Sequence, residues 1–382
     1  MGTDFYAFEM LTGRRLVPLP VASGTWSIAT NADDSLRCKI PARAAVTALL
    51  DIWGTTPLAR TGLLAVVDGM PVAAGPIWKR KYSQGKDIDL TAGGIRSYWE
   101  RRLLLPVAAR TNSLVDANGD PVAAYDTNLS GLSYGTIAKR YIELARLWPG
   151  GAIPMQLPAD EAGPYVRNVA AIDLKKVRAL IDALSNVENG PDISFRPRWS
   201  PDGLGIYWEM THGSVAKPRL GNDDPSLIGW TVGAASGGAF DLEVEEDGTN
   251  LAEEVFAAGG RSDDRVLIAR GRDTTLHDAG FPLMQAADTA HSDVVVQTTM
   301  QSYANRGAAL GKYPSSFWKM KVRAHEKGTI PLGDYWLGDV ATVTVDKSEP
   351  VLPAGDYVRR IASIGGDAAG ESFDLTFAEA IA

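Results

Sequence analysis

The chain has 382 residues, of which 45% are hydrophobic and 22% are charged, and its formal net charge is −8. The length predicts about two to four domains, and the composition excludes a disordered chain. The acidic balance argues against a sequence-independent DNA-binding protein, which needs a basic surface to neutralise phosphates. The single cysteine, Cys38, excludes an internal disulfide framework, and it shares an apolar phase with Leu36 and Ile40, which predicts a small buried side chain.

Targeting and membrane signals are missing from the sequence. No apolar run is as long as a membrane span, and the N-terminus lacks a basic-then-apolar secretory signal. Gly2 does not open a myristoylation motif, because Tyr6 stands where Ser or Thr is required. We therefore expect a soluble protein that is made in the cytoplasm and does not insert into a membrane.

Residues 1–105 are predicted to form a β-rich region. Their β-prone segments are separated by turn dipeptides such as Thr12-Gly13 and Asp68-Gly69. The segment from Leu63 to Val67 is apolar at every position, which predicts a central strand that is covered on both faces. A short helix is expected from Ile95 to Arg102.

Residues 106–205 have the pattern of a mixed α/β insertion. Ser133 is the predicted N-cap of a helix from Tyr134 to Leu147, because apolar residues recur there at helical spacing. A second helix is expected after Asp173, and strand character resumes at residues 193–196 and 204–210.

Residues 206–260 are predicted to be a further β segment. Phe240–Asp247 alternates between apolar and acidic residues, and Leu251–Ala257 is expected to pair with it across the hairpin dipeptide Asp247-Gly248. Residues 261–382 are predicted to form a second β-rich region with one helix, residues 294–310, capped by Asp293.

Three alternating runs follow that helix. Each places apolar residues on one face and polar residues on the other, as a half-buried strand does. The apolar residues are Trp318, Met320, Val322 and Ala324 in the first run, Val343 and Val345 in the second, and Phe373, Leu375 and Phe377 in the third. The fold class predicted from these patterns is α+β, mainly antiparallel β, arranged as a sheet or small barrel with an α/β insertion.

Residues that could carry chemistry are scattered. The four histidines fall in separate segments without the spacing of a zinc site: His212, His277, His291 and His325. Asp116–Asp120 opens like a calcium loop, but Pro121 replaces the required Gly, so a plain loop is predicted. Carboxylate pairs such as Glu253 and Glu254 favour solvated faces over a glycosidase pair. We predict no catalytic residue, no cofactor and no metal site, and we expect the ten tryptophans to anchor cores or subunit contacts rather than a sugar-stacking platform.

Short motifs follow one another through most of the chain. They are Phe5–Phe8 with Thr12–Arg14, Ala74–Ile77, Leu90–Trp99, Ile193–Arg196, Gly280–Leu283, and Leu337–Val340 followed by Tyr357–Ile361. This ordered set resembles the tail-hub proteins, also called minor tail or baseplate hub proteins, of long-tailed phages of actinobacteria. The resemblance implies a non-enzymatic virion protein at the tail tip of a siphophage, because the enzymatic domain of longer hub proteins is not appended.

The resemblance also implies a homotrimeric ring that joins the sixfold tail tube and distal tail protein to a threefold tip and lines the DNA channel. Each copy would contribute two tube-like β domains of barrel or sandwich type. The first would comprise residues 1–105 and the returning segment 206–260, and the second residues 261–382. The implied partners are the distal tail protein, the tape measure protein and other tail-tip proteins, with phage DNA passing without specific binding.

The candidates for a lumenal or intersubunit surface are the residues on two charged strand faces. The acidic face holds Asp241, Glu243 and Glu245, and a basic face that could pair with it across strands or subunits holds Lys319, Lys321 and Arg323. A solvated strand face explains the acidic residues equally well. A lumen of the same sign as DNA would let the DNA pass without being held. The alternatives are a glycan- or receptor-binding tail-tip module and, less favoured, a cell-wall hydrolase.

Overall fold

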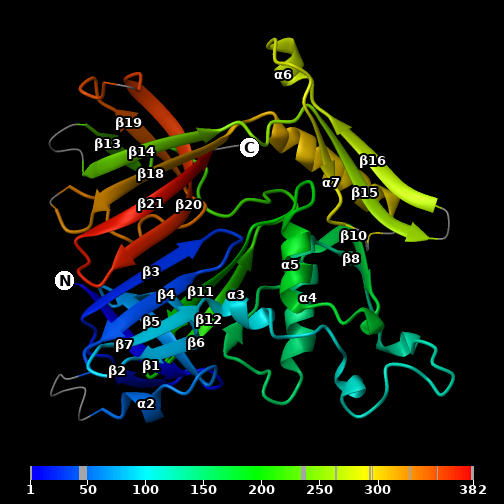
Figure 1. The fold of residues 1–382 in the computed structure, drawn as a ribbon, viewed down its shortest axis with the longest axis horizontal. Coiled ribbons are helices and arrows are strands. Elements are labelled where there is room, and N and C mark those ends of the chain that lie inside the picture. The colour runs from blue at the N-terminus through cyan, green and yellow to red at the C-terminus, as the bar shows by residue number, and fades with distance from the viewer. Residues whose placement is uncertain are drawn as a thin grey trace. The chain divides into compact units, whose positions relative to one another are not determined.

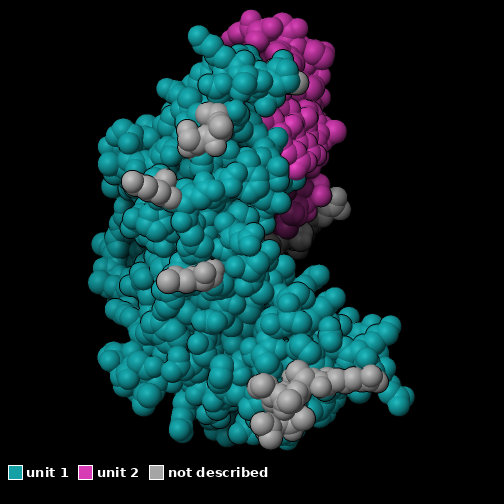
Figure 2. Space-filling view, turned by 90° about the vertical axis from the view of Figure 1, so that its left-hand side faces the viewer, with its two compact units in different colours: residues 1–182, 191–242, 319–382 teal, residues 183–190, 243–318 magenta. Residues whose placement is uncertain are grey.

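The computed structural model describes residues 2–42, 50–233, 238–262, 265–291, 294, 296–326, 328–350 and 352–379. The chain divides into two compact units, with residues 1–182, 191–242 and 319–382 in the first and residues 183–190 and 243–318 in the second (Figure 2). Strands dominate, most of them pair antiparallel, and a few helices lie between them (Figure 1). The predicted α+β class, mainly antiparallel β, is confirmed.

One long sheet runs through the first unit. Its strands follow the order β14-β18-β21-β20-β3-β4-β7-β6-β5-β1-β2, and β19 pairs with both β20 and β13. The N-terminal half supplies β1 (Thr3–Glu9), β2 (Arg15–Pro18), β3 (Ser23–Ala29), β4 (Ser35–Ile40), β5 (Thr61–Val67), β6 (Met70–Tyr82) and β7 (Ile88–Gly93). The C-terminal half supplies β13 (Gly229–Val232), β14 (Ala239–Asp247), β18 (Ser315–Arg323), β19 (Val340–Val345), β20 (Gly355–Asp367) and β21 (Ser372–Glu379).

The two halves are joined by the antiparallel pair of β3 and β20, in register from Thr25 opposite Asp367 to Ala29 opposite Ser363. Between the described strands, no pairing closes this path into a barrel. The sheet is therefore continuous across both halves and open at its ends.

The N-terminal half is built around β5. All seven residues of β5 are buried, which confirms the predicted central strand. The long strand β6 pairs with β5 from Met70 to Pro76 and with β7 from Ile77 to Tyr82. It therefore connects β5 and β7 within the sheet. Cys38 is buried in phase with Leu36 and Ile40, as predicted.

The C-terminal half confirms the three alternating runs. The predicted apolar residues of β18, β19 and β21 are buried, from Trp318 to Phe377, and residues between them are exposed or half-buried. Trp230 of β13 packs edge-on against Tyr335, with ring centroids 5.1 Å apart, and against Phe377 at 6.1 Å. Trp26 of β3 meets Phe373 of β21 at 6.1 Å, so the apolar cores of the two halves touch.

Helices and shorter strands make up the rest of the first unit, and α5 runs from it into the second. They are α2 (Ile52–Thr55), α3 (Ile95–Trp99), η1 (Val107–Arg110), η2 (Ala123–Tyr125), β8 (Thr127–Leu132), α4 (Tyr134–Arg146), β9 (Met155–Gln156), β10 (Ala162–Val169), η3 (Ala171–Asp173), α5 (Val177–Ser185), β11 (Ile193–Trp199) and β12 (Ile206–His212). Ser133 caps α4 as predicted, because its Oγ accepts a hydrogen bond from the Thr136 amide at 3.1 Å. None of the helices in the described part of the chain combines the length and apolar character that a membrane crossing needs.

The second unit is a small sheet with one helix packed on it. It contains β15 (Glu254–Ser262), β16 (Arg265–Arg272), α6 (Thr275–Asp278), β17 (Gln285–Asp288) and α7 (Gln297–Gly311). Gly271 of β16 and Gly307 of α7 let strand and helix approach closely, because an added Cβ would lie 2.1 Å from the Ala304 carbonyl oxygen or 2.8 Å from Val255.

Two local predictions are wrong. Residues 251–257 do not pair with β14: β15 pairs antiparallel with β16 and parallel with β17, whereas the neighbour of β14 is β18. Val255 of β15 packs with Ala252 and with Ala308 of α7 in a buried cluster, so β15 belongs to the core of the second unit and not to the hairpin that Asp247-Gly248 predicts.

Helix α7 begins at Gln297 rather than Val294, because Val296 keeps an extended backbone with φ −109° and ψ 117°. Asp293, its predicted cap, lies outside the described residues. At the other end, the helix runs to Gly311, one residue beyond the predicted Leu310. The helix itself is therefore confirmed, and only its first turn was misplaced.

Candidate functional site: the outer face of the long sheet

The face of the long sheet that points away from the apolar core, here called the outer face, is mainly polar across both halves, although Phe317 and Val358 are exposed on it. Residues directly opposite each other on paired strands share a face, so the register defines rows of side chains. One row crosses five strands and holds Asp367, Thr25, Arg37, Thr91 and Lys79. The next row holds Ser23, Lys39, Asp89 and Lys81.

These two rows line a groove of about 630 Å³. Its four cationic side chains, Arg37, Lys39, Lys79 and Lys81, are exposed. None of the four forms an ion pair within the part of the chain that the structure describes. A net-acidic chain thus carries a patch of net positive charge on its outer face, with four cations against the two carboxylates of Asp89 and Asp367.

The predicted charged strands lie at the far end of the same sheet. Asp241, Glu243 and Glu245 are exposed on β14, and Lys319 and Arg323 are exposed on β18 with Lys321 half-buried between them. The structure brings the two sets together, because Lys321 Nζ lies 3.4 Å from Asp241 Oδ2. The Arg323 guanidinium lies over the Phe240 ring, 5.1 Å from its centroid.

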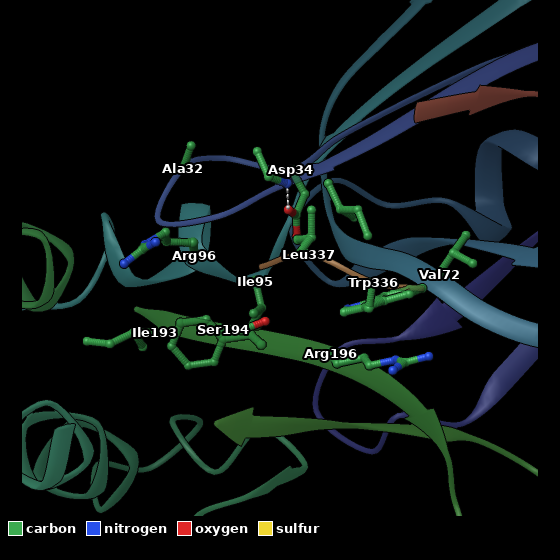
Figure 3. Close-up of a pocket in the computed structure, with 13 residues that line it drawn as sticks. Ala32, Asp34, Val72, Ile95, Arg96, Ile193, Ser194, Arg196, Trp336 and Leu337 are labelled. Atoms are coloured by element: carbon green, nitrogen blue, oxygen red, sulfur yellow. Dashed lines mark hydrogen bonds between the residues drawn. The ribbon is translucent and has the colours of Figure 1, made fainter. Parts of the chain in front are cut away.

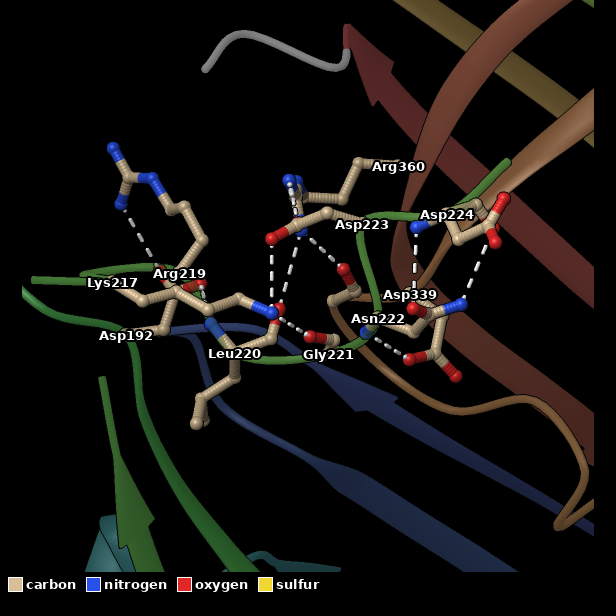
Figure 4. Close-up of polar contacts among 11 residues, drawn as sticks. Asp192, Lys217, Arg219, Leu220, Gly221, Asn222, Asp223, Asp224, Asp339 and Arg360 are labelled. Atoms are coloured by element: carbon tan, nitrogen blue, oxygen red, sulfur yellow. Dashed lines mark hydrogen bonds and ion pairs between the residues drawn. The ribbon is translucent and has the colours of Figure 1, made fainter. Parts of the chain in front are cut away.

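A polar junction ties the two halves together through residues 217–224 (Figure 4). The guanidinium of Arg360, on β20, donates to the Leu220 carbonyl at 3.2 Å, to the Gly338 carbonyl at 2.5 Å and to Asp223 Oδ1 at 2.9 Å. Asp339 Oδ1 accepts from the Asn222 amide at 2.7 Å. Sequence reasoning singled out residues 337–340 and 357–361 as motifs, and the structure shows that Asp339 and Arg360 hold the same segment.

Asp192 anchors this segment to the N-terminal half. Its side chain is 4% exposed and accepts from Asn31 Nδ2 at 2.9 Å. It also accepts from Arg219 Nη1 at 3.1 Å and from the Leu220 backbone amide at 3.1 Å (Figure 4). Sequence reasoning missed Asp192, because nothing in its local pattern distinguishes it from a turn residue after Pro191. Segment 217–224 is therefore held from both sides, and it fixes one half relative to the other.

A small cavity lies beneath the N-terminal half, with Asp34, Arg96, Ser194, Arg196 and Trp336 among its lining residues (Figure 3). Its volume of about 20 Å³ is room for about one water. Burial raises the pKa of Asp34 from 3.8 to about 7, against the lowering effects of the Ala29 amide hydrogen bond and Arg96. Arg196 stacks on Trp336 at 3.6 Å, and burial lowers its pKa to about 10.

Replacing Asp34 with Asn should remove a pH-dependent penalty on folding. The folded pKa lies above the unfolded value of 3.8, so the folded protein keeps a proton that the unfolded chain releases. Stability therefore falls as pH rises from 3.8 through about 7 and levels off above it. Relative to Asp34→Asn, the wild type should lose about 2 kcal/mol between pH 5 and pH 8 in urea unfolding. Parallel stability curves for the two proteins would contradict this assignment.

The remaining sequence candidates have local structural roles. Asp116 Oδ1 accepts hydrogen bonds from its own loop, from the amides of Asn118 at 2.8 Å and Asp120 at 2.9 Å, which lower its pKa. His291 stacks on Tyr303 at 3.5 Å and lies 2.9 Å from Asp288. Among the described residues, no three His, Cys, Asp or Glu side chains are grouped to hold a metal ion.

Solved structures share this fold over the whole chain. A tail protein from Neisseria meningitidis is 15% identical, with a TM-score of 0.57, and the match covers 100% of this chain and 97% of that one. The 43 kDa tail protein of prophage MuSo2 from Shewanella oneidensis is 9% identical, with a TM-score of 0.56 and coverage of 99% and 98%. No family model and no curated protein matches the sequence. The chain therefore has the fold of these two tail proteins.

Proposed function

We propose that this chain is a structural protein of a phage tail tip, and that copies of it assemble into a ring around a channel. One observation carries the proposal: a single sheet is continuous through both halves, and its outer face is mainly polar from β14 to β6, with Phe317 and Val358 as exposed apolar exceptions. A channel wall needs a long, mainly polar face, backed by a core that keeps its shape. The fold shared with two tail proteins supports the same role.

The ring is proposed to contain three copies, as the resemblance to tail-hub proteins of siphophages infecting actinobacteria implies. Each copy would supply two tube-like β domains, one formed by β1–β7 and one by β13, β14 and β18–β21. The segment 206–260 does not return to the first of them, because β13 and β14 pair with β19 and β18. Three copies would then present six β domains to a sixfold tail tube and a threefold-symmetric surface to the tip. The pairing of β3 with β20 supports this arrangement, because it sets the two halves of one copy side by side in one sheet.

In this role the chain works by shape and charge, without catalysis. Its proposed neighbours are the distal tail protein, the tape measure protein and further tail-tip proteins, and its proposed location is the virion tail. The charged strands β14 and β18 are proposed to face the lumen or a neighbouring copy. The Lys321–Asp241 pair shows that these two surfaces are complementary in charge within one copy.

Reversing the charge of the acidic face of β14 should disturb assembly and leave the fold intact. All three carboxylates are exposed, so Asp241→Lys, Glu243→Lys and Glu245→Lys together should leave the chain folded. The melting temperature should fall by a few degrees, because Asp241 has φ +53° and pairs with Lys321. We expect light scattering on the purified wild type to give about three times the chain mass of 40.8 kDa, and the variant to give a smaller species or slower DNA ejection in phage.

The matched control is Asp87→Lys with Asp120→Lys and Asp173→Lys, three exposed carboxylates outside the long sheet and outside segment 217–224. It should assemble like the wild type. A wild-type protein that stays monomeric inside assembled tails would refute the ring, whereas an intact ring in the β14 variant would refute only the role of that strand.

A further inference from the structure

The groove on the outer face of β3, β4, β7 and β6 has the chemistry of a phosphate-binding surface. Arg37 and Lys39 stand on β4, and Lys79 and Lys81 stand on β6, with β7 between them. Residues two apart on a strand lie about 6.7 Å from each other, and neighbouring strands are about 4.8 Å apart. The four cations therefore form an open rectangle about 7 Å by 10 Å, wide enough to bridge several anionic groups.

The other lining groups narrow the class of ligand. Hydroxyls of Ser23, Thr25 and Thr91 stand in the same rows as the cations, and such hydroxyls commonly contact phosphate oxygens. None of the described residues that line the groove is aromatic, so nucleic acid bases have nothing to stack on. The groove thus suits a sugar–phosphate backbone whose bases are paired and stacked elsewhere.

An acidic peptide fits the groove less well. Extended peptides gain affinity by adding a strand to a free sheet edge. Here β3, β4 and β7, which form the floor of the groove, each have strand neighbours on both sides. Only the second part of β6, after Pro76, has β7 as its single strand neighbour, and that edge lies at the rim. Contacts across the floor must therefore come from the charged and hydroxyl side chains.

We propose that this groove binds the phosphodiester backbone of double-stranded DNA without regard to sequence. The inference rests on the proposed function for the identity of the polyanion, since a tail channel conducts duplex DNA. Four cations give weak and salt-sensitive binding, which is reversible enough for a polymer that must move through. Asp89 and Asp367, within the same rows, limit the affinity further.

Fluorescence anisotropy with a labelled duplex of about 20 base pairs tests the proposal on the full chain. We expect wild-type binding at low salt, with affinity falling as salt rises and a log–log slope between about −2 and −4. Lys79→Glu with Lys81→Glu should weaken binding by about tenfold or more at equal salt. Lys79→Gln with Lys81→Gln should give a smaller loss in the same direction, and thermal melts show that each variant is folded.

The matched control is Arg110→Glu with Lys347→Glu, two exposed cations outside the groove that carry the same charge change. It should bind DNA as the wild type does. Three results would each overturn the proposal. The groove variants could bind DNA as well as the wild type does, or the control could lose as much binding as the groove variants. The third is that a polyglutamate peptide binds more tightly than DNA. Light scattering on the same samples separates the two claims: a ring without DNA binding defeats only this inference, and a DNA-binding monomer defeats only the ring.

Discussion

Replacing Gly338 with Ala should destabilise the protein by about 3 kcal/mol or more. Gly338 has φ +88°, and a Cβ there would lie 2.5 Å from the Leu220 carbonyl oxygen. Its neighbour across the junction, Gly221, has φ +89°, and a Cβ there would lie 2.2 Å from the Gly338 carbonyl carbon. The two backbones approach too closely for any side chain, and neither can shift without losing the hydrogen bonds of Arg360. Chemical denaturation of the purified variant measures the loss.

The matched control for this substitution is Gly119→Ala. Gly119 has φ +90°, but a Cβ there would meet nothing within 4 Å. Its cost should be limited to the left-handed backbone, about 1–2 kcal/mol. If Gly338→Ala cost no more than Gly119→Ala, the close approach at the junction would have no energetic weight, and the junction would not be a rigid connection.

Replacing Asp192 with Ala should cost about 3 kcal/mol, because a buried acceptor of three hydrogen bonds is lost at once. The change removes the acceptor of the Leu220 backbone amide and of the Asn31 side-chain amide. It also removes the carboxylate that lies 3.1 Å from the Arg219 guanidinium. We expect chemical denaturation to show this decrease in the free energy of unfolding, and limited proteolysis to cut faster within residues 217–224.

Two variants separate the causes. Asp192→Asn keeps the shape and one acceptor oxygen and removes the charge, so it should cost less than Asp192→Ala. Asp224→Ala removes an exposed carboxylate that serves only the turn at Ser226, and it should be close to neutral. Equal stability of Asp192→Ala and Asp224→Ala would show that segment 217–224 is held mainly from the side of Arg360.

The junction matters for the proposed ring because both halves of one copy must present the outer face along one curve. The β3–β20 pair sets their register, and segment 217–224 fixes the angle through Asp192 on one side and Arg360 on the other. A loose junction would leave each half folded and the six units of a ring misaligned. Destabilising junction variants should therefore reduce assembly before they reduce the yield of folded chain.

Much of the fold could be predicted from residue patterns, because the controlling interactions are local. The alternation from Trp318 to Ala324 separates a buried from an exposed face wherever the strand pairs. The unbroken apolar run from Leu63 to Val67 can only be covered on both sides. Ser133 caps its helix through a hydrogen bond to Thr136, three residues along the chain.

Long-range pairing could not be predicted in the same way. Asp247-Gly248 has the composition of a hairpin turn, yet β14 lies beside β18, which begins 68 residues after β14 ends, because the partner of a strand is chosen by the whole core. The row from Asp367 through Arg37 to Lys79 exists only once the register of five strands is known. The sequence therefore predicted the charged strands β14 and β18 and missed the basic groove and Asp192.

A density map of the purified assembly or of the intact tail tip would show whether this chain forms a ring around a channel. We predict a threefold ring in which β3, β4, β7, β6, β20 and β21 turn their outer face toward a central channel, with Arg37 and Lys79 on its wall. A map in which single copies stand alone, or in which this face is packed against another protein and no channel exists, would rule out the ring.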